Sequence, residues 1–119
     1  MNDTDVFTLS QQGMVANFYL TKLGRLPTKY EAMMYLIEEM SELVVAIEQG
    51  ALDEEILKEI QDVRYTLAGY ELARGWNGDS AFQLVHNSNM TKQPATNGKV
   101  QKGEGYVAPD LRECLGGNA

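Results

Sequence analysis

Residues 31–63 decide the fold of this chain, and they read EAMMYLIEEMSELVVAIEQGALDEEILKEIQDV. Apolar residues recur every three to four positions on both sides of Gly50, which is the spacing of amphipathic helices. Gly50 is a natural end for the first helix because glycine adopts the left-handed conformation without strain. Only Ala51 and Leu52 separate it from a candidate helix start at Asp53. A link this short predicts two antiparallel helices packed side by side.

The two helices of this hairpin have recognisable ends. The first is predicted from Thr28 to about Gln49, because Thr28 and Glu31 have the spacing of a capping box. The second is predicted from an N-cap at Asp53 to Gly75. Each helix carries an apolar stripe that we expect to be buried. These stripes are Met33, Leu36, Ile37, Met40, Leu43, Val44 and Ile47 on the first helix, and Ile56, Ile60, Val63, Leu67 and Tyr70 on the second.

Two shorter helices flank the hairpin in the sequence. One is predicted from about Val6 to Leu23, where the apolar periodicity ends before a glycine. The other is predicted from a cap at Asp79 to about Met90.

The composition changes after Lys92. Residues 93–119 are rich in Gly, Pro, Asn and Lys and have no sustained period, so we expect an irregular tail. The predicted fold is all-α, a four-helix bundle-like domain over residues 1–92 followed by a loop or tail over residues 93–119.

Composition and charge narrow the class of protein. The chain has 119 residues, enough for one domain, and 44% of them are hydrophobic, enough for a core. A net charge of -7 argues against non-specific binding to nucleic acid or to an anionic membrane. The single cysteine, Cys114, cannot form an internal disulfide, and no apolar run approaches the roughly 20 residues of a membrane span. The polar, acidic N-terminus is unlike a signal peptide, so we expect a cytoplasmic protein.

Two acidic clusters lie on the predicted hairpin. Glu39 and Glu42 lie one turn apart on the first helix, and Glu59 and Asp62 lie one turn apart on the second. If the helices are antiparallel, four carboxylates converge. Like charges this close raise one another's pKa, a cost that a bound divalent cation removes. The pattern indicates a magnesium site, and the alternative is a pair of solvated acidic faces.

The C-terminal segment carries the opposite charge. Lys92, Lys99 and Lys102 follow one another without an acidic residue between them. Lysines on a flexible segment can close over a polyphosphate as mobile point charges, and Asn89 lies one turn before Lys92 on the same side of its helix. Carboxylates for a metal and lysines for an anion together predict a metal–polyphosphate site. A solvated tail without a ligand is the alternative.

Other candidate groups are weaker. Asn17, Phe18 and Tyr19 could contact a nucleotide base or belong to the core, and Asn17 is the polar candidate among them. Tyr65 is interpreted as a packing residue, and a lone helical histidine such as His86 is more often structural than catalytic. The sequence contains no GxxxxGK[ST] phosphate loop and no CxxC pair.

The acidic pattern resembles that of a known superfamily, the all-α nucleoside triphosphate pyrophosphohydrolases of MazG type, to which the phosphoribosyl-ATP pyrophosphohydrolases also belong. The family pattern EExxE, a spacer and ExxD is matched by Glu38, Glu39, Glu42, Glu59 and Asp62. Residues 85–92 (VHNSNMTK) and residues 98–111 (GKVQKGEGYVAPDL) are similar to segments of a subgroup that is common in phages. The resemblance covers roughly residues 10–111.

The resemblance implies a reaction and a set of metal ligands. The reaction is hydrolysis of a (d)NTP to its monophosphate and pyrophosphate, with a guanine preference suggested by the phage-like subgroup. The implied cofactor is Mg²⁺, for which Mn²⁺ can substitute. The implied ligands are Glu39, Glu42, Glu59 and Asp62. Glu38 is implied to accept a proton from the attacking water or to orient it.

The resemblance also implies partners. Asn89, Lys92 and Lys102 are implied to contact phosphates. Members of the superfamily are typically dimers or dimers of dimers, so we expect a homodimer or homotetramer with a base pocket near the subunit interface. The location is the host cytoplasm if a phage encodes the chain. The alternatives are phosphoribosyl-ATP as the substrate, and a non-catalytic helical module that binds a metal or a partner.

Overall fold

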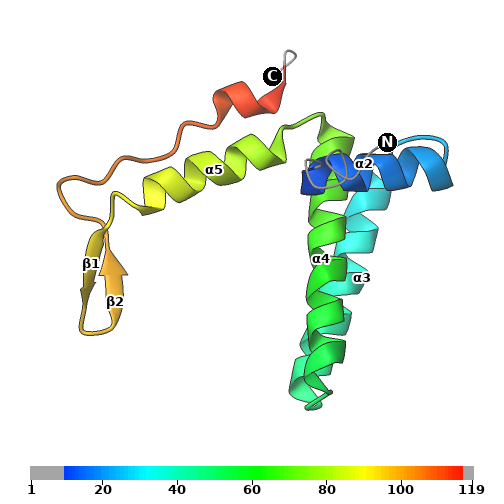
Figure 1. Ribbon diagram of the computed structural model, residues 1–119, viewed down its shortest axis with the longest axis horizontal. Coiled ribbons are helices and arrows are strands. Elements are labelled where there is room, and N and C mark those ends of the chain that lie inside the picture. The colour runs from blue at the N-terminus through cyan, green and yellow to red at the C-terminus, as the bar shows by residue number, and fades with distance from the viewer. Residues whose placement is uncertain (1–9, 117–119) are drawn as a thin grey trace, which may run out of the picture. The chain divides into compact units, whose positions relative to one another are not determined.

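The computed structural model of the chain describes residues 10–116 (Figure 1). This part is mostly helical, which confirms the all-α prediction. The chain divides into two compact units, and the boundary in the sequence lies between Trp76 and Asn77. Among the described helices, none combines the length and the apolar character needed to cross a membrane. The start of the N-terminal helix predicted from Val6 lies outside the described residues.

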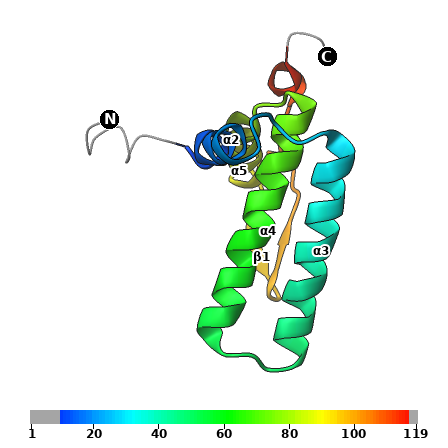
Figure 2. The ribbon, with the colours of Figure 1, turned by 90° about the vertical axis from the view of Figure 1, so that its right-hand side faces the viewer.

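The described part of the first unit, residues 10–76, contains three helices: α2 (Gln11–Lys22), α3 (Lys29–Glu48) and α4 (Asp53–Arg74). As predicted from the short link, α3 and α4 lie side by side and antiparallel (Figure 2). Helix α2 packs across the C-terminal half of α4. The small core of this unit lies at that crossing, where Val15 and Tyr19 of α2 meet Ala68 of α4.

The predicted capping box at the start of α3 is confirmed. The backbone N–H of Glu31 donates to Thr28 Oγ1 at 3.1 Å, and the backbone N–H of Thr28 donates to Glu31 Oε1 at 2.9 Å. Arg25 adds a bidentate ion pair, with Nη1 2.8 Å from Glu31 Oε1 and Nη2 3.1 Å from Oε2. These contacts lower the pKa of Glu31 to about 2, and the hydrogen bond from Arg25 is the largest cause.

Two predicted N-caps are wrong. Asp53 is the first residue of α4, and the N-cap position belongs to Leu52, whose side chain makes no capping hydrogen bond. The acidic first turn of α4 instead complements the positive end of the helix dipole. Helix α5 (Gly78–Asn89) is capped by Asn77 rather than Asp79, because the Asn77 side chain accepts a hydrogen bond from the Ser80 N–H at 3.0 Å.

The apolar stripes of α3 and α4 are less buried than predicted. On α3, Leu36 and Leu43 are half-buried, but the other five stripe residues are exposed. Ile37, Val44 and Ile47 are 51%, 51% and 55% exposed. On α4, Leu67 is also exposed. The reason is geometric: a two-helix hairpin covers only the line of side chains between its helices, and the rest of each stripe needs another layer.

The second unit begins with α5 and continues into a β-hairpin that was not predicted from the sequence. Strands β1 (Gln93–Thr96) and β2 (Lys99–Gln101) pair antiparallel, with Gln93 opposite Gln101. Asn97 and Gly98 connect them, both at positive φ (54° and 77°), as a two-residue turn of this hand requires. The prediction of an irregular tail is therefore wrong for this segment.

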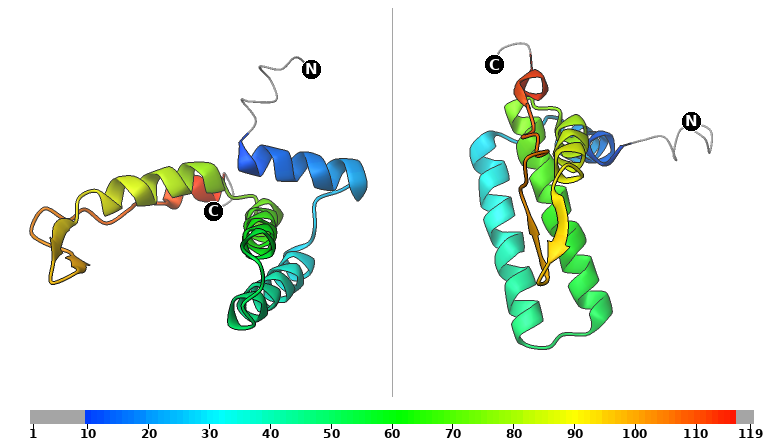
Figure 3. Two further views of the ribbon diagram at one scale, coloured as in Figure 1. Left: turned by 60° about the horizontal axis from the view of Figure 1, so that its bottom comes forward. Right: turned by 90° about the vertical axis from the view of Figure 1, so that its left-hand side faces the viewer.

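After β2 the chain runs back along α5 (Figure 3). Val107 is held at the end of α5 by two hydrogen bonds. Ser88 Oγ donates to the Val107 carbonyl at 2.6 Å, and the Val107 N–H donates to Thr91 Oγ1 at 2.8 Å. At the other end of α5, the Asn77 N–H donates to the carbonyl of Cys114, which is buried in the 3₁₀ helix η1 (Arg112–Leu115).

The ion pair at the start of α3 generates a prediction about pH. Glu31→Gln can keep the capping hydrogen bonds but removes the charge that pairs with Arg25. The variant should melt below wild type at neutral pH. Because the pKa of Glu31 lies at about 2 instead of 4.5, its charge stabilises the fold above pH 4.5. That contribution is lost as the pH falls towards 2, so the two melting temperatures should converge there when followed by circular dichroism.

Arg25→Gln is the matched control for this experiment, since it removes the other partner of the same ion pair and should reproduce the loss at neutral pH. A difference between wild type and Glu31→Gln that stays constant down to pH 2 would show that the carboxylate charge has no role in stability.

Candidate metal centre

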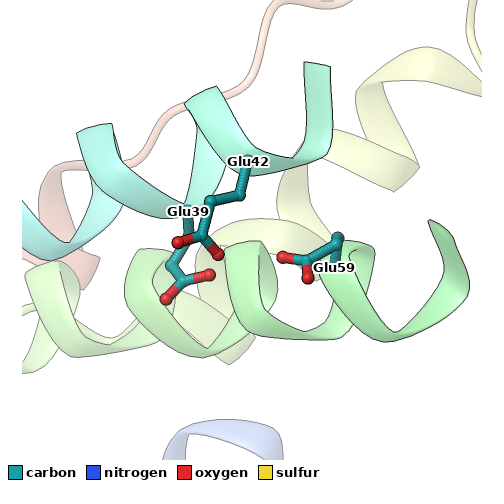
Figure 4. A group of neighbouring side chains, drawn as sticks. All are labelled: Glu39, Glu42 and Glu59. Carbon is teal, nitrogen blue, oxygen red and sulfur yellow. The ribbon is translucent and has the colours of Figure 1, made fainter. Parts of the chain in front are cut away.

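Three of the predicted metal ligands converge between α3 and α4. Glu39 and Glu42 come from α3 and Glu59 from α4, and Figure 4 shows their carboxyl groups turned towards one another. One carboxylate oxygen from each lies within 4.8 Å of the others. Glu39 and Glu59 are half-buried, whereas Glu42 is exposed. The helix spacing and the antiparallel hairpin together produce this arrangement.

Two oxygens of this group lack partners in the described part of the chain. Oε2 of Glu39 and Oε2 of Glu59 are shielded from solvent and accept no hydrogen bond. A buried carboxylate oxygen without a donor loses its hydration and gains nothing in return. These atoms are therefore poised to accept a ligand that carries positive charge.

The electrostatics of Glu39 agree with this geometry. Burial raises the pKa of Glu39, and the negative charges of Glu42 and Asp62 raise it further. A divalent cation would relieve this repulsion, and several carboxylate oxygens are the hard ligands that Mg²⁺ prefers. The residues present thus fit the magnesium ion that the sequence implied.

The fourth predicted ligand, Asp62, is held by a lysine. Lys58 Nζ lies 2.6 Å from Asp62 Oδ2 and 3.7 Å from Glu59 Oε1. This hydrogen bond to Asp62 is the main reason that the pKa of Lys58 is raised. The side chain of Lys58 is 67% exposed, so it is free to leave. Lys58 thus supplies a positive charge to the same carboxylates that a metal would use.

Glu38, the predicted catalytic residue, lies beside this group and not within it. It is exposed on α3, next in sequence to Glu39, and it is not one of the three converging carboxylates.

A cleft of about 450 Å³ adjoins the carboxylates within the first unit. Its lining comes from all three helices and consists of Phe18, Tyr19, Lys22, Leu23, Tyr35, Glu39, Asp62, Tyr65 and Thr66. As whole residues, Phe18, Tyr35 and Tyr65 are 42%, 37% and 40% exposed. The cleft therefore places half-exposed aromatic rings next to two of the predicted metal ligands.

Only part of the cleft lining corresponds to residues predicted from the sequence. Phe18 and Tyr19 line the cleft, in agreement with the interpretation that they could contact a base. Asn17 does not line it. Asn17 is exposed on another side of α2, where its Oδ1 accepts from Thr21 Oγ1 at 3.5 Å. Lys22 was missed, although its spacing of four from Phe18 puts both on one face of the helix. Tyr65, interpreted as a packing residue, also lines the cleft.

The predicted phosphate-binding residues all belong to the second unit. Asn89 is the exposed last residue of α5, and Lys92 follows it half-buried. The ammonium of Lys102 lies 4.9 Å from the centre of the Tyr106 ring, a cation–π contact. Because Val107 is hydrogen-bonded to Thr91, Tyr106 and its lysine are tied to the C-terminal end of α5.

Comparison with known proteins adds no family assignment. No protein-family model matches the sequence, and no curated protein matches it. Function is therefore inferred from the carboxylate group, the adjoining cleft and the sequence motifs.

The position of Lys58 generates a prediction about metal affinity. Lys58→Ala removes the positive charge that competes with a cation for Asp62 and Glu59, so Mn²⁺ should bind severalfold more tightly than to wild type. Isothermal titration calorimetry without nucleotide measures this directly. Lys58→Arg, which keeps the charge, is the matched control and should bind Mn²⁺ within about twofold of wild type. Weaker binding by Lys58→Ala would show that Lys58 supports the site.

Proposed function

We propose that the protein is a metal-dependent nucleoside triphosphate pyrophosphohydrolase that converts a (d)NTP and water to the monophosphate and pyrophosphate. One observation carries the proposal: three carboxylates, two of which have a buried, unpartnered oxygen, converge beside a cleft lined by exposed aromatic side chains. The resemblance of the acidic pattern to the MazG-type superfamily agrees with this chemistry and adds the bond that is cleaved.

In this proposal the acidic residues divide into ligands and a base. Glu39, Glu42 and Glu59 hold Mg²⁺, and Asp62 joins them once it releases Lys58. When bound, the ion neutralises phosphate charge and lowers the pKa of a coordinated water. Glu38, exposed beside the ligands, accepts a proton from the attacking water or orients it.

The nucleoside is proposed to occupy the cleft. Stacking of a base on an aromatic side chain contributes about 1–3 kcal/mol, and the rings of Phe18, Tyr35 and Tyr65 are exposed enough to take part. Lys22 adds a positive charge to the same cleft. A guanine preference remains a prediction from the resemblance, because aromatic stacking is tolerant of the base.

The lysines of the second unit are proposed to bind phosphates. Lys92 and Lys102, with Asn89, provide donors at the C-terminal end of α5. Lysine is suited to this role as a compact charge on a flexible stem. In this proposal Lys102 exchanges its contact with the Tyr106 ring for a phosphate oxygen.

The exposed apolar side of the hairpin supports a homodimer or a dimer of dimers. Ile37 and Val44 lie two turns apart on one face of α3, and both are half-exposed. A second copy offers the same face, so a two-fold interface would cover both at once. We propose a cytoplasmic oligomer of this kind, in the host cytoplasm if a phage encodes it.

The metal role predicts distinct effects for neighbouring carboxylates. Glu39→Gln and Asp62→Asn should lose most pyrophosphate release from a panel of (d)NTPs and should bind Mn²⁺ at least about tenfold more weakly. Glu38→Gln, the matched control one residue away, should lose kcat but keep Mn²⁺ affinity. Calorimetry and a pyrophosphate assay distinguish these roles.

Three outcomes would each contradict a different part of the proposal: the metal requirement, the catalysis or the substrate. Full wild-type activity in excess EDTA would exclude a metal-dependent reaction. Metal binding without turnover of any nucleotide would favour a non-catalytic metal-binding module. Release of pyrophosphate from phosphoribosyl-ATP alone would change the substrate and leave the metal chemistry intact.

The interface predicts that charge on the apolar face disrupts assembly. Wild type should be a dimer or tetramer by light scattering. The double variant Ile37→Lys/Val44→Lys places like charges opposite each other across a two-fold axis, so it should be monomeric. Glu48→Lys, at the exposed end of α3, is the control and should stay assembled. A strictly monomeric wild type would contradict the proposed oligomer.

A further inference from the structure

Gly69 occupies an unexpected place for a glycine. It lies in the interior of α4 and is buried. Glycine there weakens a helix relative to alanine, because it loses more conformational freedom on folding. Its backbone is ordinary helix and not left-handed, so conformational freedom does not explain the glycine. The remaining explanation is the space that a side chain would fill.

That space is taken by Tyr19 from α2. A Cβ at Gly69 would lie 3.1 Å from Tyr19 Oη and 3.3 Å from its Cε2, closer than ordinary van der Waals contact. Tyr19 is 8% exposed and packs with Val15 and Ala68 in the core of this unit. The phenol ring is therefore seated directly against the backbone of α4, and a methyl group at residue 69 would push it outwards.

The position of Tyr19 is transmitted to the cleft through ring contacts. Phe18 meets Tyr19 edge-to-face, with ring centres 5.3 Å apart, and meets Tyr65 in the same way at 5.5 Å. All three rings line the cleft beside Glu39 and Asp62. A shift of Tyr19 therefore changes the orientation of the half-exposed Phe18 ring that a ligand would touch.

We infer that Gly69 is a positioning residue for this aromatic wall, the rings of Phe18, Tyr19 and Tyr65, and that it sets the affinity of the cleft for a planar aromatic ligand. The packing of Tyr19 against Gly69 involves only residues of the first unit. Only the identity of the ligand as a nucleotide base rests on the proposed function.

The packing is tested without a ligand. Gly69→Ala, labelled with fluorotyrosine, should shift the fluorine resonance of Tyr19, which the Tyr19→Phe variant assigns by its absence. Mn²⁺ affinity should stay within about twofold of wild type, because the substitution does not touch the carboxylates. An unchanged Tyr19 resonance would overturn the inference.

The consequence is tested with nucleotide. Gly69→Ala should raise KM at least about fivefold, the lower limit of what one base–aromatic stack contributes, while kcat stays within about twofold. A merely structural role would lower the amount of folded protein and leave KM unchanged. The double variant Gly69→Ala/Tyr19→Phe removes the hydroxyl nearest to the added methyl but keeps the ring carbon at 3.3 Å, so its KM should fall from that of Gly69→Ala towards that of Tyr19→Phe.

The remaining outcomes are also decisive. If Gly69→Ala does not fold, recovery of folding and KM in the double variant supports the inference, and failure to recover overturns it. If wild type binds no nucleotide, the proposed function fails, and the shift of the Tyr19 resonance still decides whether Gly69 positions the wall. An unchanged KM in a folded Gly69→Ala protein with a shifted resonance would overturn the link to ligand affinity.

Discussion

Repulsion between carboxylates is the constraint on which the first unit depends. The short link between α3 and α4 forces the helices together, and the acidic turns of both then face one another. The pKa of Glu39 is raised, and one buried oxygen each of Glu39 and Glu59 accepts no hydrogen bond. Lys58 relieves part of this repulsion from the solvent side. If the proposed metal binds at these carboxylates, the same repulsion that lowers the stability of the fold also favours binding of the cation.

The features that the sequence predicted correctly are encoded within a few residues of one another. The capping box at Thr28 and Glu31 and the left-handed glycine at Gly50 depend on local chemistry. The convergence of three carboxylates adds one inference, the antiparallel hairpin. The β-hairpin also had a local signal in Asn97 and Gly98, but its strands are too short to show alternation.

What the sequence did not predict depends on distant residues. The cleft combines α2, α3 and α4, and no spacing within one helix indicates that Tyr35 and Tyr65 face the same space. The prediction that the apolar stripes are buried was wrong for a related reason. Periodicity marks a face as apolar, but it does not say whether the covering layer belongs to the same chain. Ile37 and Val44 lie on such a face.

The return of the chain along α5 has a consequence for the order of events during synthesis. The N-terminal end of α5 is hydrogen-bonded to Cys114, and its C-terminal end is hydrogen-bonded to Val107. Translation delivers these partners well after α5 itself, at about 5–20 residues per second. The α3–α4 hairpin does not depend on later residues, because its two helices follow one another directly in the chain. In a ribosome-bound chain, the first unit should therefore already be folded before the segment that packs along α5 has been synthesised.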